Sequence, residues 1–467
     1  MSQAKTSWWM AAGQPGKLVP MLCAYQIETI NRELDGILYF ALHLAAKGLP
    51  MLVGDRMVSR YVLGHNNPVI WFDKDQHKKT NERILAKGGV VLNINAEGQG
   101  FVDQPAEMQR NFAKVIDYVT TLCVWGDKQA NTLRGIVPIE KQDRIAVTGH
   151  PAFDLVAPKF TPYFENPAIK DEHGEDYILI NTSFAMFNHQ MGFDYYVKML
   201  SKMDEWKIYG SSDHLAYLEI RRAHQERTAL AFIDLAKTLS KQFPDRHIII
   251  RPHPGEGKQF YLDRVGSPNI IVTKDGSARE WIASAAAVVH HDCTTGMEAM
   301  LMGKLVLQYE PYEGTEGSAT LMTGIGQRVT SPIEAIAHIE QGTMPEKTGQ
   351  ALRDKLAPYL QNINANAAAT IADMAATHAD TTTWLPEPLG LWGNVKCWRK
   401  YLSKLLRAKQ PGRNGRKVQY ALNKFSRLHK TEVERRLKGL REAEPTLPEV
   451  SVQQLCLNTF LIKPLDS

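Results

Sequence analysis

The sequence predicts an α/β protein with two parallel-sheet domains. Short apolar segments that end in polar or glycine-rich residues alternate with longer amphipathic segments, which is the pattern of parallel strands joined by helices. The chain has 467 residues, more than one hydrophobic core usually supports, so we expect two domains and an appendage. Its composition, 44% hydrophobic and 22% charged, is that of an ordinary globular protein.

The first domain is expected over residues 18–157, after an N-terminal extension over 1–17. It opens with a strand at Leu18–Cys23 and a helix at Glu28–Lys47, and the helix ends where Gly48 tolerates a left-handed cap. Further strands of this domain are predicted at 51–54, 68–72, 89–94, 121–125 and 144–148.

The second domain is expected over residues 177–345, after a linker at 158–176 that is rich in proline and charge. A helical return segment over 346–383 follows, with one alanine-rich helix at 351–376, and then a basic helical tail over 384–467, with a flexible loop at 409–417 and one helix at 418–440. The strands of the second domain are predicted at 177–180, 247–250, 270–272, 287–290 and 305–309, with a long helix at 215–242.

Cysteine usage and apolar content predict a cytoplasmic protein. The five cysteines have neither disulfide nor metal-ligand spacing, which suits a reducing compartment. No segment approaches the roughly 20 apolar residues of a membrane-spanning helix, and the first residues lack the apolar core of a signal peptide.

Positive charge is concentrated near the C-terminal end. Residues 396–442 contain sixteen Lys and Arg against three Glu, so the rest of a chain of net charge +5 carries about eight negative charges. With Trp392 and Trp398 close by, this segment is typical of a helix on the inner face of an anionic membrane. A solvated appendage is the alternative. Nucleic acid is not an expected partner, because no nucleic-acid module is recognisable.

Two loops carry the chemistry that the sequence predicts. In the second, the strand that ends at His290 is followed by Thr294-Thr295-Gly296 at a helix start, where hydroxyls and unpaired amides attract phosphate. Gly296 would permit close approach of the backbone, and Glu298 would accept hydrogen bonds from a ribose. A capped helix without a ligand explains the same residues. A metal site at His290-His291-Asp292 is not predicted, because neighbouring strand residues point oppositely.

The first loop is Arg251-Pro-His-Pro-Gly-Glu256. Pro252 and Pro254 stop the apolar strand and present His253 at its end, beside the fixed charge of Arg251. These residues would bind a nucleotide phosphate and offset its charge as it departs. A structural histidine in a turn is the alternative. Asn181 and Ser183, which end another strand, are further candidates for phosphate or base contacts.

These motifs together resemble GT-B glycosyltransferases, and more narrowly the bacterial surface-carbohydrate biosynthesis proteins. The resemblance rests on residues 251–254 and 293–306, with Ile30–Gly36, Gly149–Asp154 and Ile180–Ser183, and covers roughly residues 18–345. It implies two Rossmann-like doubly wound domains, a nucleotide-sugar donor as co-substrate and no cofactor or metal.

Related enzymes that use CMP-activated acidic sugars, such as Kdo and sialic-acid transferases, have acidic-Gly, His-Pro and paired-hydroxyl motifs. The resemblance implies that Glu97-Gly98, His253-Pro254 and Thr294-Thr295 fill these places, although Ala96 stands where a second acid is frequent. Glu97 follows a predicted strand and is the candidate general base, or else an ordinary solvated loop glutamate. Arg32, Glu33 and Asp35 are candidates for the acceptor side, or else a solvated helix face.

The sequence therefore predicts a glycosyltransferase of capsule or O-antigen type biosynthesis, acting on a glycan or lipid-linked acceptor. Three alternatives stay open at this point: a CDP-glycerol or CDP-ribitol type polyol-phosphate transferase, a nucleotide-sugar 2-epimerase, and a non-catalytic membrane-attached assembly protein.

Overall fold

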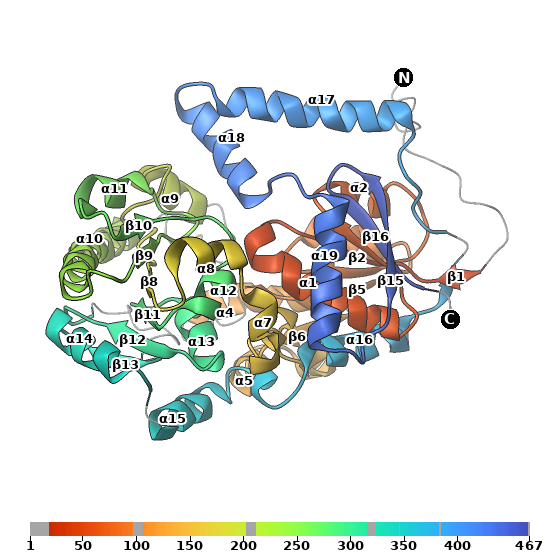
Figure 1. Cartoon of the computed structure of the whole chain (residues 1–467). Coiled ribbons are helices and arrows are strands. Elements are labelled where there is room, and N and C mark those ends of the chain that lie inside the picture. The colour runs from red at the N-terminus through yellow and green to blue at the C-terminus, as the bar shows by residue number, and fades with distance from the viewer. Residues whose placement is uncertain are drawn as a thin grey trace. The chain divides into compact units, whose positions relative to one another are not determined.

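The computed structural model describes residues 18–96, 106–201, 212–314, 324–344, 346–382 and 384–465. The chain divides into two compact units. The N-terminal unit combines the chain up to Leu155 with the chain from Ala357 onward, and the central unit is Val156–Leu356. Each unit has one main sheet (Figure 1), so the predicted class of two doubly wound α/β domains is confirmed.

The sheet of the N-terminal unit has the order β15-β16-β3-β2-β4-β5-β6-β7. The six strands from β3 to β7 are parallel, and the strand order reverses between β2 and β4. They are β2 Cys23–Gln26, β3 Met51–Gly54, β4 Ile70–Asp73, β5 Val90–Ile94, β6 Thr121–Val124 and β7 Ile145–Val147.

The one helix whose bounds were predicted in the first part of this unit, Glu28–Lys47, forms as α1 over Ile30–Ala46. This helix buries Leu34, Ile37, Leu38 and Leu42 along one stripe, as an amphipathic helix against a sheet should. The others are α2 Met57–Leu63, α3 Lys78–Leu85, α4 Ala106–Ala113, α5 Asp127–Arg134 and α6 Pro151–Asp154, with α1 at Ile30–Ala46 and 3₁₀ turns at Lys114–Tyr118 and Ile139–Arg144.

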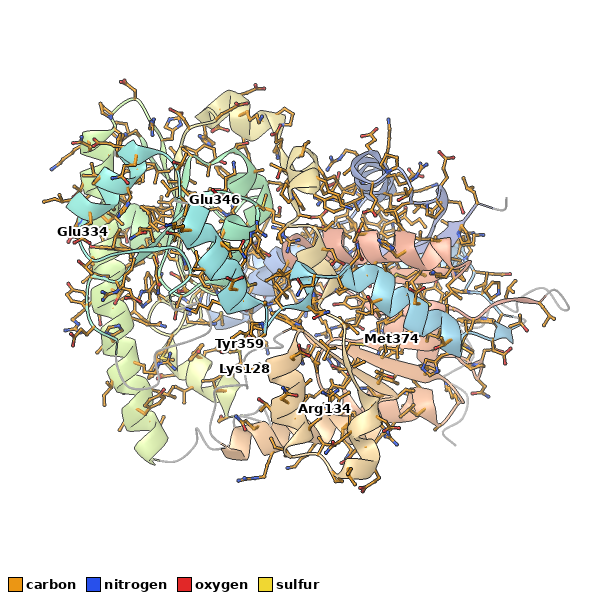
Figure 2. All side chains as sticks on the ribbon, turned by 90° about the horizontal axis from the view of Figure 1, so that it is seen from below. Lys128, Arg134, Glu334, Glu346, Tyr359 and Met374 are labelled. Carbon is orange, nitrogen blue, oxygen red and sulfur yellow. The ribbon has the colours of Figure 1, made fainter. Side chains whose placement is uncertain are left out.

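The chain re-enters the N-terminal unit beside the start of α5. Gln361 N donates to Trp125 O at 2.7 Å, Lys128 N donates to Pro358 O at 2.8 Å, and the Lys128 ammonium lies 4.5 Å from the centre of the Tyr359 ring. Figure 2 shows Lys128 and Tyr359 together, with Met374 further along the same segment. The single helix predicted at 351–376 is wrong. It is two helices, α15 Glu346–Leu356 and α16 Ala367–His378, because Pro358 and a 3₁₀ turn at Gln361–Ile363 separate them.

The end of the chain is only partly the helical segment that the sequence predicts. Helices form at α17 Leu391–Ala408, α18 Arg413–Lys424 and α19 Lys430–Ala443, so the single helix expected at 418–440 is interrupted near Leu428, which is buried. A hairpin of β15 Val450–Cys456 and β16 Thr459–Pro464 then pairs antiparallel with β3. The turn of this hairpin packs against Gly54, the last residue of β3. Glycine is required there because φ is +151° and a Cβ would lie 2.2 Å from Asn458 O.

The central unit has a six-stranded parallel sheet of order β10-β9-β8-β11-β12-β13. The chain leaves β8 in one direction and returns to extend the sheet from β11 in the other, so the order reverses between these two strands. The strands are β8 Ile178–Asn181, β9 Ile248–Arg251, β10 Ile270–Val272, β11 Ala287–His290, β12 Leu305–Tyr309 and β13 Gln327–Val329.

The segment 158–176, treated as a linker from the sequence, is folded in the central unit. Phe160 and Phe164 are buried there, and the Arg279 guanidinium lies 5.8 Å from the Phe164 ring. The helices of the unit are α7 Thr161–Phe164, α8 Pro167–His173, α9 Phe193–Leu200, α10 Ser212–Gln242, α11 Gln259–Val265, α12 Ala278–Ser284, α13 Thr294–Leu301 and α14 Pro332–Gln341, with α15 at the end.

Within the described ranges, none of the helices has both the length and the apolar composition needed to cross a bilayer.

Candidate functional site

The candidate site lies at the carboxyl edge of the central sheet, where the strand order reverses. In open α/β sheets, a ligand binds outside the carboxyl ends of the two strands at such a reversal. Here those strands are β8 and β11, and β9 lies directly beside β8. The loops after these three strands are the ones to which the sequence assigned phosphate and base contacts.

Glu256 organises the first loop. Its carboxylate is fully buried and accepts hydrogen bonds from Thr182 Oγ1 and Phe184 N at 2.9 Å, from His253 N at 3.2 Å and from the Tyr261 hydroxyl. Burial raises the pKa of Glu256, and these hydrogen bonds act against the increase. The sequence interpretation missed this role. A carboxylate directly after the His-Pro turn was the available signal.

His253 stands exposed on this braced turn. Its Nδ1 accepts a hydrogen bond from Gly255 N at 3.1 Å. A neutral ring that accepts at Nδ1 carries its hydrogen on Nε2, so the turn fixes the tautomer that can donate to a phosphate oxygen. Pro254, next in the chain, is also exposed, and its carbonyl accepts from Gln190 Nε2 at 3.0 Å.

Arg251 has a structural contact. Its guanidinium donates to the carbonyls of Asp275 and Gly276 and lies 5.5 Å from the Trp281 ring. Burial lowers its pKa to about 10. The structure thus places the Arg251 guanidinium on the loop between β10 and α12, and its contact with a phosphate stays a prediction.

The loops after β8 and β11 are joined directly, since Ser183 Oγ donates a hydrogen bond to Asp292 Oδ1. Helix α13 begins at Thr294, which is exposed, while Thr295 is half-buried with its hydroxyl 3.1 Å from Cys293 Sγ. The first amides of α13 and the Thr294 hydroxyl therefore stand at the carboxyl edge, as the phosphate hypothesis requires.

The missing side chain of Gly296 makes room for the His290 ring and not for a ligand. A Cβ at position 296 would lie 2.3 Å from His290 Nε2. His290 is fully buried, with Nε2 2.7 Å from Ile325 O and Nδ1 accepting from Cys293 N at 3.4 Å. Burial lowers its pKa to about 4, so the ring is neutral near pH 7. The close approach that the sequence interpretation reserved for a ligand is made by this ring.

Glu298 is already paired. Its Oε1 lies 2.6 Å from the guanidinium of Arg279, which is buried. The predicted ribose contact would have to share the carboxylate with this arginine.

Asn181 has a donor without a partner at the same edge. The side chain is buried at the end of β8, and among the described residues nothing accepts a hydrogen bond from its Nδ2. A buried unpaired donor is unfavourable by about 1–3 kcal/mol. A ligand oxygen at the strand-order reversal would satisfy this amide.

In the N-terminal unit, Glu97 lies outside the described residues, so its role as a base stays a prediction. Arg32 is exposed, whereas Glu33 and Asp35 are buried. Lys74 Nζ lies 3.0 Å from both oxygens of Glu33, and Arg436 lies 2.5 Å from Asp35. The alternative of a solvated helix face therefore fails for the two acids.

A second polar network follows β4 and was missed from the sequence. Asp73 Oδ1 lies 2.7 Å from His77 Nδ1, and Asp73 Oδ2 accepts from Asn81 Nδ2 at 2.7 Å and Asn93 Nδ2 at 3.3 Å. The hydrogen bond to Asp73 raises the pKa of His77. The signal was an Asp-Lys pair where an apolar strand ends, at the reversal between β2 and β4.

Fold and site together define a two-domain α/β protein with polar loops at the strand-order reversal of each sheet. No family model and no curated protein sequence matches the chain. Among solved structures, it is similar to UDP-GlcNAc 2-epimerase from Methanocaldococcus jannaschii in complex with UDP-GlcNAc and UDP, at 11% identity and a TM-score of 0.47 over 76% of this chain and 100% of that one. It is also similar to the wall teichoic acid polymerase TagF, at 10% identity and a TM-score of 0.49 over 76% and 88%. A third is MnaA of S. aureus with UDP, at 9% and 0.41 over 75% and 94%. None of these similarities assigns an activity to this chain.

Proposed function

We propose that this chain is a glycosyltransferase of surface-polysaccharide assembly, of the GT-B type, which binds its nucleotide-activated donor at the carboxyl edge of the central sheet. One observation carries the proposal. Three polar loops meet at the strand-order reversal, held together by Glu256 and by the Ser183–Asp292 hydrogen bond. A rigid edge of donors at this position suits a nucleotide phosphate.

The geometry of the three loops supports the following donor contacts. The Thr294 hydroxyl and the first amides of α13 would hold phosphate oxygens, and His253 Nε2–H would donate to the oxygen that gains charge as the bond to the sugar breaks. Asn181 Nδ2, which lacks a partner among the described residues, would donate to the nucleotide. These protein groups offset the leaving charge, and the donor class we favour is a CMP-linked acidic sugar.

The acceptor would be deprotonated by Glu97, which remains our candidate on sequence grounds. Of the three acceptor-side candidates, only Arg32 is exposed to contact a glycan directly. Glu33 and Asp35 would act by positioning, through Lys74 and Arg436.

Nucleotide preference is the first test. A ligand that binds only the folded state raises its thermal stability, so CMP, CDP, UDP and GDP should be compared by thermal shift. We expect one nucleotide to stabilise the chain, and Thr294→Val to weaken its binding about tenfold or more, because a hydrogen bond to a charged group is lost. Thr343→Val, at an exposed position beyond α14, is the matched control. No stabilisation by any nucleotide would contradict the proposal.

Acceptor dependence is the second test. A glycosyltransferase releases nucleotide only when acceptor is present, and Glu97→Gln should keep nucleotide binding while losing transfer. Turnover of donor alone would indicate an epimerase. Transfer of a polyol phosphate would indicate the teichoic-acid type of reaction. Glycan production that depends on the chain but survives both His253→Ala and Glu97→Gln would indicate a scaffold.

A further inference from the structure

Helix α17 is an amphipathic helix that contacts α18 and β15 and leaves the rest of its surface exposed. It is 18 residues long, and none of them is buried. Its apolar side chains are exposed to an extent that is rare on a globular surface: Trp392 is 80% exposed, Leu391 76%, Leu406 70% and Leu402 50%. In Figure 1, α17 runs along the top of the view, with α18 descending from one end.

Five apolar side chains of α17 form one stripe. Leu391, Val395, Trp398, Leu402 and Leu406 follow one another at intervals of three or four residues, which places them on one face of the helix. Lys396, Lys400, Lys404 and Arg407 repeat at the same spacing on another face. A helix with an apolar stripe and a basic face lies in the plane of a membrane interface.

The charge of the segment decides which occupant fits. Residues 391–424, which include α17 and α18, contain ten Lys and Arg and no Asp or Glu. A second copy of the same surface would repel it, and a nucleic acid would leave the leucine stripe uncovered. An anionic bilayer offers phosphate groups to the cations and acyl chains to the stripe.

The pair of helices α17 and α18 is held in place firmly enough to present that stripe. At its start, Leu389 N donates to Leu455 O in β15 at 2.8 Å, and Asn394 Nδ2 donates to Leu389 O at 2.6 Å. Beside its middle, the Arg427 guanidinium lies 4.6 Å from the centre of the Trp398 ring. Beyond these contacts, Leu402 and Leu406 of the stripe stay exposed.

The end of α18 reaches the carboxyl edge of the N-terminal sheet. Lys424 Nζ, at the end of α18, lies 2.8 Å from Glu28 Oε1, and Glu28 Oε2 lies 3.4 Å from Lys74 Nζ. Glu28 comes two residues after β2, at the reversal of that sheet. The α17–α18 pair is therefore held at the carboxyl edge of the N-terminal sheet, beside Arg32.

We propose that α17 and α18 form a docking surface for an anionic lipid bilayer, with the stripe from Leu391 to Leu406 inserted among the acyl chains. The lipid binding stands independently of the reaction. Its consequence, that a lipid-linked acceptor meets the edge beside Glu28 at the bilayer, rests on the proposed glycosyltransferase function.

Vesicle flotation of the full chain tests the surface without any nucleotide. The chain should float with vesicles of equal parts phosphatidylglycerol and phosphatidylcholine, and not with phosphatidylcholine alone. Leu402→Asp combined with Leu406→Asp should lower the partition coefficient at least about tenfold, because each leucine contributes a comparable factor when it leaves water. Both side chains are exposed, so the fold is kept. The matched control is Ile139→Asp with Ile333→Asp, at two isoleucines elsewhere that are even more exposed, and should float like the wild type.

A second pair of variants tests the basic face of α17. Lys400→Gln with Lys404→Gln should weaken flotation about tenfold or more, whereas Lys78→Gln with Lys79→Gln, exposed on α3, should leave it unchanged. Flotation of the Leu402/Leu406 variant equal to that of its control would overturn the proposal. So would equal flotation on neutral vesicles, or a chain that ignores vesicles and instead forms a dimer that the same two aspartates dissociate.

Discussion

Lys74 Nζ lies 3.0 Å from both carboxylate oxygens of Glu33, and both side chains are buried at the carboxyl edge of the N-terminal sheet. The pair joins α1 to the loop after β4, the two elements that flank the strand-order reversal. Tyr25, at β2, and the backbone amide of Thr29 also donate to the Glu33 carboxylate, at 3.2 and 2.8 Å. A buried charge pair held by this many donors fixes the shape of the edge.

Glu33→Ala is expected to destabilise the N-terminal unit by up to about 3–5 kcal/mol, because it leaves the buried Lys74 ammonium, among the described residues, with only the longer 3.4 Å contact to Glu28. Urea unfolding measures the change. Glu82→Ala, which removes the exposed partner of Lys78, should change stability by less than about 1 kcal/mol. The double variant Glu33→Leu with Lys74→Met should recover much of the loss. A double variant as unstable as Glu33→Ala would show that the pair itself is not the cause.

Gly296→Ala is expected to destabilise the central unit by about 1–3 kcal/mol, because the new methyl group would overlap the buried His290 ring. The matched control is Gly349→Ala in α15, where a Cβ meets nothing within 4 Å and the better helix propensity of alanine should add up to about 1 kcal/mol. Thermal unfolding of the two variants provides the comparison. A Gly296→Ala variant that is no less stable than the wild type would mean that the ring moves aside.

Much of the fold was predictable because strand period and strand ends are local properties. The strands at 270–272, 287–290 and 305–309 have the predicted bounds. A short apolar run bounded by turn residues is typical of a buried strand. The β15–β16 hairpin at the end was missed, although Val450 and Val452 alternate with polar residues and Leu461 lies in a short apolar run. The many cations before it pointed to helix throughout, and pairing with β3 is a long-range contact.

The site was predictable to the level of loops and not of atoms. Carboxyl ends of parallel strands meet at one edge, so the closeness of Ser183 to the loop after β11 follows from topology. The bonding partners of individual side chains do not follow from topology. Glu298 pairs with Arg279 and Gly296 packs on His290 because of tertiary packing, which no local pattern records.

His290 should make the central unit sensitive to mild acid. Its folded pKa of about 4 lies below the unfolded value of about 6.5. The neutral ring therefore contributes stability that is fully present above pH 6.5 and is lost as the pH falls from about 6.5 to about 4, up to roughly 3 kcal/mol. The difference in unfolding free energy between wild type and His290→Gln, measured across this range, isolates the effect from other groups. A difference that does not change with pH would contradict the assigned neutral state.

The terminal hairpin should be required for the N-terminal unit, because Leu461 in β16 is buried in the same apolar cluster as Leu22 in the first part of the chain and Leu52 in β3. Leu461→Ala is expected to lower the free energy of unfolding by about 2–5 kcal/mol through the cavity that it leaves. Leu465→Ala, just beyond β16 and half exposed, should change it by less than about 1 kcal/mol. Urea unfolding of both variants makes the comparison. An unchanged Leu461→Ala would mean that the hairpin adds nothing to the stability of the sheet, and a truncation near Trp384 could then be used to test the basic helices. If the loss is observed, membrane binding must be tested with point substitutions on α17, since truncation would also remove β15 and β16.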